Sequence, residues 1–335
     1  MQQSANYLDL PTPFLVLAPM DDVTDTVFRS IIASCAPPDM YFTEFVNVDG
    51  LMSVGRSKLL KKARFTTIDR PLILQLWGLK PDNFEAVARQ VADGTLAREF
   101  GLPEGVNYAG IDLNMGCPAK SEVSNGTCSA LINNRELASA IIEATQRGLD
   151  GKLPLSVKTR VGFNAVDMTW IEFLLSKQLA MLTVHGRTRA QMSKVPADWE
   201  LIGQARQLRN RIAPDTLIVG NGDVRDHAHG MELAERYGLD GIMIGRGVFH
   251  DPFVFAETSP WQSWSRDMKI ALYQRHVELF AATWRDGERP VYTLNKFCKI
   301  YINGFDGAHE LREQLMASES TAQLLTSLQA LSKNR

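Results

Sequence analysis

Residues 110–118 read GIDLNMGCP, and this stretch decides the fold. It begins as a short aliphatic run and ends in Asn114, Gly116, Cys117 and Pro118, which predicts a buried strand that opens into a tight loop. Seven other short aliphatic runs resemble it. The eight predicted strands are 14–18, 40–45, 72–76, 110–114, 155–159, 181–184, 217–220 and 241–244.

Amphipathic segments alternate with these runs, at 81–93, 135–147, 170–177, 199–209 and 224–237. Continuous apolar strands that alternate with helices are typical of a parallel sheet covered on both faces. Eight strand–helix units within about 250 residues predict a closed (β/α)₈ TIM barrel. A doubly wound open sheet is the alternative, but no GxGxxG motif follows the first predicted strand.

Beyond the eighth strand the pattern is only helical, at 268–285, 292–303, 308–317 and 320–332. It predicts a small, all-helical C-terminal bundle. We therefore expect two domains, a barrel at 1–255 and a helical domain at 256–335.

The composition restricts the class of protein. With 45% hydrophobic and 22% charged residues, the 335-residue chain is typical of a soluble globular protein. Its four cysteines show no CxxC spacing, which argues against a zinc knuckle or a disulfide framework and favours the cytoplasm. We expect no membrane partner, metal or signal peptide, and we expect a monomer.

One local charge cluster stands out. Residues 55–64, GRSKLLKKAR, contain five basic side chains and no acidic one. This segment is either a solvated helical face or a surface that binds the phosphates of a nucleic acid.

Active sites of TIM barrels lie at the carboxyl ends of the strands. Polar or glycine residues follow nearly every predicted strand, so we expect them to converge there. These candidates are Pro19, Met20, Gln75, Asn114, Cys117, Lys158, His185, Arg187, Asn221, Gly222, Asp223, Gly245 and Arg246. The glycines after strands seven and eight favour a phosphate cradle, as for a flavin mononucleotide.

Two side chains in this set carry the chemistry. Lys158, at a strand end, would stabilise an anionic reduced flavin, with a Schiff-base lysine as the alternative. Cys117 lies in a tight loop, and an ordinary thiol with a pKa of about 8.5 is protonated at neutral pH and can act as a general acid. Cys35, Cys128 and Cys298 are interpreted as core residues.

Several motifs together resemble the tRNA-dihydrouridine synthase family. They occur in the family's order and cover roughly residues 13–255. They are LAPMDDVTD (17–25), DLNMGCP (112–118), VKTRVG (157–162), VHGRTR (184–189), GNGDV (220–224) and IMIGRG (242–247).

The resemblance implies an FMN-dependent reduction of the uracil C5=C6 bond, with NADPH as the electron source. Hydride would pass to C6 and the Cys117 thiol would protonate C5. Asn114 and Arg187 would contact the uracil or its nucleotide. The residues implied to bind FMN are Pro19, Met20, Gln75, Lys158, His185, Asn221, Gly222, Asp223, Gly245 and Arg246. Cys128 stands where relatives often have Gly or Ala, which makes it the alternative acid.

The resemblance also implies that 1–255 is the FMN-binding catalytic barrel and that 256–335 binds tRNA. Basic and aromatic residues alternate in the second region, although an ordinary amphipathic face would look similar. They are Lys296, Lys299 and Arg312 beside Tyr292, Phe297 and Tyr301. The remaining alternatives are ribosomal RNA as the substrate, a flavoprotein barrel that acts on a small pyrimidine, as dihydroorotate dehydrogenases do, and a non-catalytic RNA-binding protein.

Overall fold

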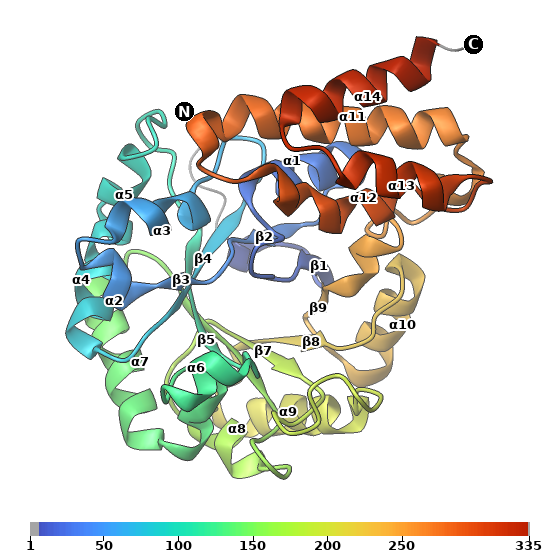
Figure 1. Ribbon diagram of the computed structural model, residues 1–335. Coiled ribbons are helices and arrows are strands. Elements are labelled where there is room, and N and C mark those ends of the chain that lie inside the picture. The colour runs from blue at the N-terminus through green and yellow to red at the C-terminus, as the bar shows by residue number, and fades with distance from the viewer. Residues whose placement is uncertain (1–6, 334–335) are drawn as a thin grey trace. The chain divides into compact units, whose positions relative to one another are not determined.

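The computed structural model describes residues 7–333 and contains a closed ring of eight parallel strands. The ring closes because β1 pairs with both β9 and β2, and β2 pairs with β4 (Figure 1). Its strands are β1 (Phe14–Leu17), β2 (Met40–Phe42), β4 (Leu72–Trp77), β5 (Gly110–Met115), β6 (Leu155–Arg160), β7 (Met181–His185), β8 (Leu217–Asn221) and β9 (Gly241–Ile244). The predicted TIM barrel is confirmed, and all eight predicted strands are present.

The second predicted strand is interrupted. The expected 40–45 run ends at Phe42, and a short β3 (Val46–Asn47) pairs with the later part of β4. The Thr43 hydroxyl accepts a hydrogen bond from the Gln75 backbone N–H at 3.1 Å and donates to the Glu44 carbonyl at 2.6 Å. A side chain thus replaces one link of the backbone ladder, which is how local Thr hydrogen bonds compete with a sheet.

Helices lie outside the ring (Figure 1). The longer ones are α4 (Pro81–Ala92), α7 (Arg135–Leu149), α8 (Met168–Leu175), α9 (Trp199–Ile212) and α10 (His227–Tyr237). Asn or Asp side chains cap the N-termini of α7 to α10, which fixes where these helices begin. The shorter elements are η1 (Tyr7–Asp9), α2 (Val48–Leu51), α3 (Arg56–Ala63), α5 (Thr95–Arg98), α6 (Lys120–Ser124) and η2 (Cys128–Asn133).

Alternate strand residues face the inside of a barrel. At one end the interior is filled by an apolar cluster that includes Tyr7, Phe14, Val16, Met40, Phe42, Ile73, Met181, Val219 and Met243. Two residues further along the strands, the equivalent positions become polar: Ile73 is followed by Gln75, Met181 by Thr183, and Val219 by Asn221. The interior is therefore apolar toward the amino ends of the strands and polar toward their carboxyl ends.

The chain folds into two compact units, one of residues 1–26 and 38–245 and one of 27–37 and 246–335. The division falls at Arg246, ten residues before the expected boundary, and it places most of α1 (Thr26–Cys35) in the second unit. Within that unit the Phe28 ring stacks on Phe297, with ring centroids 5.0 Å apart. This contact explains why the segment belongs there.

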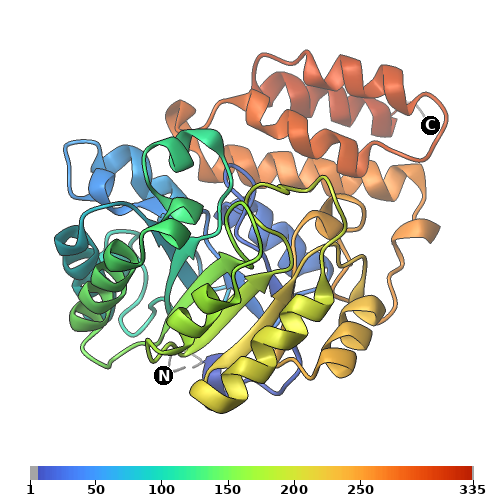
Figure 2. The ribbon, with the colours of Figure 1, turned by 90° about the horizontal axis from the view of Figure 1, so that it is seen from below.

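The described part of the second unit is helical, as predicted. Its long α11 packs against α12 and α14 (Figure 2). The elements after 245 are η3 (Arg246–Phe249), η4 (Trp261–Ser263), α11 (Arg266–Thr283), η5 (Arg285–Gly287), η6 (Val291–Leu294), α12 (Asn295–Tyr301), α13 (Ala308–Met316) and α14 (Thr321–Lys333). Among residues 7–333, no helix has the length and apolar character that crossing a membrane requires.

Candidate active site

Strand register brings the predicted site residues together at one end of the barrel. Asn114 of β5 is the register partner of Lys158 of β6. Two residues further, Arg160 pairs with His185 of β7, and His185 pairs with Asn221 of β8. All strands are parallel, so their carboxyl ends share one face, as the sequence predicted.

The loop after β5 is held by Asn114. Its Oδ1 atom accepts hydrogen bonds from the backbone N–H groups of Gly116, at 3.1 Å, and Cys117, at 2.9 Å. This Asx-type turn fixes where the chain leaves the strand. It therefore fixes the position of the half-buried Cys117.

The Cys117 thiol is not in the unperturbed state that its sequence context suggested. A hydrogen bond from the Cys128 thiol, aided by the Ala119 N–H and the charge of Arg160, lowers the pKa of Cys117 to about 7 against burial and Glu122. The same contact raises the pKa of the buried Cys128. Cys128 was correctly predicted to be buried, but it also serves as a hydrogen-bond donor to the candidate acid.

Arg160 is a site residue to which the sequence alone assigned no role. Its guanidinium is 6% exposed and donates to three backbone carbonyls: Gly116 at 2.8 Å, Thr188 at 3.1 Å and Met192 at 3.0 Å. Burial lowers its pKa to about 10, and the Cys117 thiolate opposes that shift. The side chain thus connects the end of β6 to the loops that follow β5 and β7, and it places a positive charge near the thiol.

Lys158 is a second cation at the polar end of the barrel interior. Burial is the main cause that lowers its pKa to about 8, and the nearby charge of Arg160 acts in the same direction. Asp112 and Cys117 oppose that shift. At neutral pH the ammonium group is therefore still mostly protonated, as a group that stabilises an anion must be.

Arg187, which is 3% exposed, belongs to a network at the ends of β7 and β8. It forms an ion pair with Asp223, donates to the Val195 carbonyl at 2.6 Å, and lies 3.1 Å from His185 Nε2. Because Arg can only donate, Nε2 must accept, which places the proton of a neutral His185 on Nδ1. The Asp223 carboxylate also accepts from the Ala197 N–H at 2.9 Å.

The candidate phosphate cradle has a close-packed backbone. Asn221 donates to the Met243 carbonyl at 2.8 Å and so ties β8 to β9. Gly222 has a φ of +138°, and an added Cβ would lie 2.5 Å from Ala197 Cβ and 3.2 Å from the His185 ring. Only glycine fits this position.

The other predicted cofactor residues lie at the strand ends as expected. Pro19 and Met20 follow β1 and are half-buried, and a Cβ on Gly245, after β9, would lie 4.0 Å from Met20 Sδ. Gln75 is buried on β4. Arg246 is exposed and begins the later segment of the second unit, and its contact with FMN stays a prediction.

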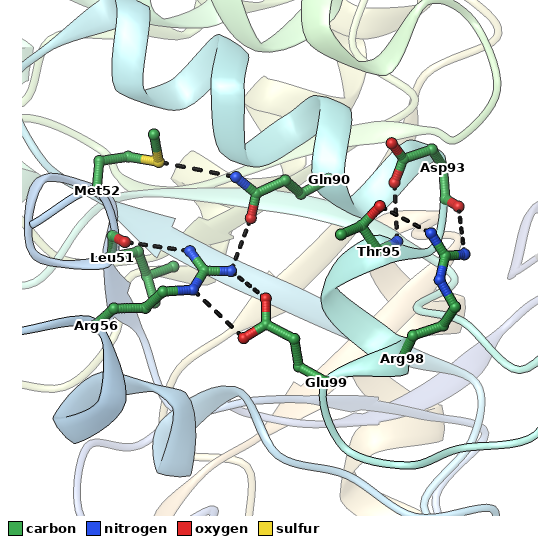
Figure 3. A network of polar contacts seen from close by, with 8 residues as sticks. All are labelled: Leu51, Met52, Arg56, Gln90, Asp93, Thr95, Arg98 and Glu99. Atoms are coloured by element: carbon green, nitrogen blue, oxygen red, sulfur yellow. Dashed lines mark hydrogen bonds and ion pairs between the residues drawn. The ribbon is translucent and has the colours of Figure 1, made fainter.

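The basic segment 55–64 forms α3, and part of its charge is neutralised within the barrel unit. Arg56 forms an ion pair with Glu99 and donates to Gln90 at 2.8 Å and to the Leu51 carbonyl at 3.1 Å (Figure 3). Lys62 forms an ion pair with Asp21. These contacts favour a structural role for the two side chains over a phosphate grip.

In the helical unit, the expected row of aromatic RNA contacts is wrong for two of its three members. Phe297 is 3% exposed and Tyr301 is fully buried, because both face the core formed with α1 and α11. Arg312 donates to the Ile302 carbonyl at 2.8 Å, just after the end of α12. Tyr292, Lys296 and Lys299 are exposed.

Comparisons with known proteins identify the family of the chain. The family model described as dihydrouridine synthase (Dus) matches residues 16–335. "Probable tRNA-dihydrouridine synthase" of Staphylococcus aureus (strain COL) is 42% identical over 318 residues, which cover 94% of this chain and 92% of that protein. "Probable tRNA-dihydrouridine synthase 2" of Bacillus subtilis (strain 168) is 42% identical over 316 residues, covering 93% and 92%.

A solved structure, that of histamine dehydrogenase from Rhizobium sp. 4-9, has a TM-score of 0.52 at 11% identity. The match covers 83% of this chain and half of that protein, and it shows a shared fold alone. The family match, by contrast, extends over nearly the whole chain, including the loop of Cys117 and the helical region. The chain belongs to the dihydrouridine synthase family, and it is an oxidoreductase.

Proposed function

We propose that this protein reduces the C5=C6 bond of uridines in tRNA, with FMN and NADPH as redox cofactors and Cys117 as the acid at C5. The observation that carries the proposal is the position of Cys117. Its thiol lies directly beyond β5, among groups that keep its pKa close to neutral. An acid is most effective when its pKa lies near the working pH, because it is then both protonated and a strong donor.

The polar groups at the carboxyl ends of the strands are of the kinds that bind FMN. Lys158 supplies a cation that would lie against the N1–C2=O edge of the ring, and Gln75 and His185 offer polar contacts. Backbone groups at Asn221, Gly222 and Gly245 would receive the phosphate, and Arg246 is the proposed guanidinium ligand. The chemistry that FMN would supply at this place is the hydride for C6 of the uracil.

The residues around the thiol would orient the base. Asn114 would contact the uracil and also holds the Cys117 loop. Arg187 would contact the base or its nucleotide, and Asp223 orients the Arg187 guanidinium. The carboxylate of Asp223 is thus a support for Arg187, so any contact of Asp223 with the FMN phosphate would involve its backbone.

The helical unit is proposed to bind tRNA through exposed side chains. Lys296 and Lys299 lie one turn apart on α12 and would contact phosphates, and Tyr292 would stack on an unpaired base. A target base inside a folded RNA must be extruded to reach the thiol. We expect a cytoplasmic monomer with NADPH as its electron source, and we expect tRNA rather than ribosomal RNA as the substrate.

The experiment is a comparison of cysteine variants. Purified protein should show a flavin band at about 450 nm and form dihydrouridine in tRNA with NADPH. Cys117→Ala should retain the flavin and its reduction by NADPH but lose product formation, whereas Cys298→Ala, a buried cysteine of the helical unit, should behave as wild type.

Protein that stays colourless after addition of FMN would overturn the cofactor proposal. Loss of product in Cys128→Ala but not in Cys117→Ala would identify the other thiol as the acid. Mapping dihydrouridine in the RNA of a strain that lacks the protein would distinguish tRNA from ribosomal RNA as substrate.

A further inference from the structure

A continuous chain of hydrogen bonds runs through the barrel interior to the Cys117 loop, and it starts at Asp112. This residue lies in the middle of β5 and is fully buried. One of its carboxylate oxygens accepts from the Ser156 hydroxyl at 2.6 Å, and the other accepts from Gln75 Nε2 at 2.7 Å. The strand register places Asp112 opposite both partners.

Each link of this chain determines the direction of the next. Because Gln75 donates its Nε2 to Asp112, its Oε1 is turned toward Asn114 and accepts from Nδ2 at 3.2 Å. Asn114 must therefore present Oδ1 to the loop, where it accepts from the N–H of Cys117 at 2.9 Å. The two amides then share one consistent orientation, which the acceptor at position 112 sets at one end and the backbone N–H groups of Gly116 and Cys117 support at the other.

We propose that Asp112 is a positioning residue for the reaction at Cys117, acting through Gln75 and Asn114 to fix the loop that carries the thiol. Its role in catalysis rests on the proposed function, but its control of the loop does not. Neither the family motifs nor the strand pattern gave Asp112 a role.

A buried carboxylate is a costly way to stabilise a barrel, since a hydrophobic side chain of similar volume often stabilises as well or better. Burial raises the pKa of Asp112 to about 7, while Ser156, Gln75 and the Lys158 cation oppose the rise. The residue is therefore better explained by the orientation that it imposes than by stability.

The environment of Cys117 makes the loop geometry measurable. The groups that face its thiol are Cys128, the Ala119 N–H, Glu122, Arg160 and Lys158. Asp112 acts on the thiol only at a distance, through the two amides and through Lys158. If the Cys117 loop loses its fixed position, the contacts that lower the pKa of the thiol are lost, and the pKa of Cys117 rises.

The test is the rate of Cys117 alkylation by iodoacetamide at pH 7, followed by mass spectrometry on the purified full-length protein. It needs neither flavin nor RNA. In Asp112→Leu, which removes the acceptor at similar volume, we expect alkylation to slow about fivefold or more, which corresponds to a rise of about one unit in the pKa of the thiol. Formation of dihydrouridine should show a lower kcat with little change in KM for tRNA.

Two further variants test whether the effect of Asp112 comes from the orientation of the two amides, from its negative charge, or from a general loss of stability. Asp112→Asn keeps an acceptor oxygen for Gln75 but loses the charge, so it should recover most of the alkylation rate. Thr183→Val changes another buried polar side chain of the interior, one whose hydroxyl has no hydrogen-bond partner within residues 7–333, and it should alkylate as wild type.

An unchanged alkylation rate in folded Asp112→Leu would overturn the proposal. It would also be overturned if alkylation slowed as much in Asp112→Asn as in Asp112→Leu. If Asp112→Leu fails to fold, Gln75→Met interrupts the chain one link nearer the loop and must show the same slow alkylation. Failure of the wild-type protein to form dihydrouridine would sink the proposed function but would leave the alkylation result standing.

Discussion

Arg187 and Asp223 form an ion pair between the loops that follow β7 and β8. The guanidinium is almost fully buried, and its other partners are the neutral His185 ring nitrogen and the Val195 carbonyl. Asp223 is partly exposed and has a φ of +53°, a conformation that non-glycine residues adopt at a cost. The strained backbone is retained where the carboxylate must reach the guanidinium.

Replacing Asp223 should therefore destabilise the barrel and weaken substrate binding. Removal of one partner from a buried pair leaves an uncompensated charge, and partial exposure reduces the cost, so we expect Asp223→Ala to lose about 2 kcal/mol of unfolding free energy. Urea denaturation measures this, and KM for tRNA should rise. The control is Lys152→Ala, which removes an exposed ion pair with Asp150 and should change stability little. Equal losses in both variants would contradict the assignment.

The pH dependence of product formation should follow the Cys117 thiol. It donates only when protonated, so activity should fall as the pH rises through about 7. Cys128→Ala removes the hydrogen bond that lowers the pKa, and the alkaline limb should then move to higher pH while alkylation at pH 7 slows. A pH profile of single-turnover rates measures the shift, and Cys298→Ala serves as the control. Identical profiles for wild type and Cys128→Ala would show that the thiol contact has no effect.

The close packing of α4 and α7 depends on Gly148. An added Cβ would lie 2.3 Å from the Glu85 carbonyl oxygen and 2.7 Å from Ala88 Cβ. Overpacking of this kind costs about 1–3 kcal/mol, so Gly148→Ala should lower the melting temperature clearly. Gly230 lies in α10, where a Cβ would meet its neighbours at 3.4 Å or more, and Gly230→Ala should be neutral or stabilising. A thermal melt that ranks the two variants the other way would refute this packing argument.

His276 should make the helical unit sensitive to acid. It is buried among the rings of Phe28, Phe297 and Tyr301, and burial lowers its pKa to about 3. In the unfolded chain His276 takes up a proton below about pH 6.5, whereas in the folded protein it stays neutral. The free energy of unfolding therefore includes the full contribution of neutral His276 only above that pH. It should fall by at most about 1.4 kcal/mol per pH unit as the pH drops toward 3.

Urea denaturation at pH 7.5 and pH 5, monitored by tryptophan fluorescence, tests this dependence. In His276→Phe the difference between the two pH values should shrink. Replacement of the exposed His309 should leave the difference as in wild type. A pH dependence that survives in His276→Phe would assign the effect to other groups.

The positions of the strands could be predicted from the sequence, because each is a short aliphatic run. The end of the barrel that carries the candidate site could also be predicted, because these runs end in Gly, Asn or charged residues. The sequence was not sufficient for Asp112 and Arg160. Both lie within motifs, but their partners come from distant parts of the chain. Strand register brings Ser156 and Gln75 to Asp112, and the course of the loops after β5 and β7 brings three backbone carbonyls to Arg160.

Two other features depend on how the chain folds back. Cys128, whose thiol donates to Cys117, has a positive φ, and no local pattern predicted this backbone conformation or the contact. Phe297 and Tyr301 are four residues apart and so share one face of α12, and that face is the buried one. The alternative of an ordinary amphipathic helix was the correct interpretation for these two aromatics.

The unit that contains α1 is assembled from two distant pieces of chain, and this affects how the protein can be made. During synthesis α1 leaves the ribosome well over two hundred residues before α11 and α12, which supply the ring partners of Phe28. Until then Phe28 lacks the aromatic rings on which it packs in the folded unit. For the same reason no single cut, at 245 or at 255, yields two independent fragments, because each would separate α1 from the helices on which it packs.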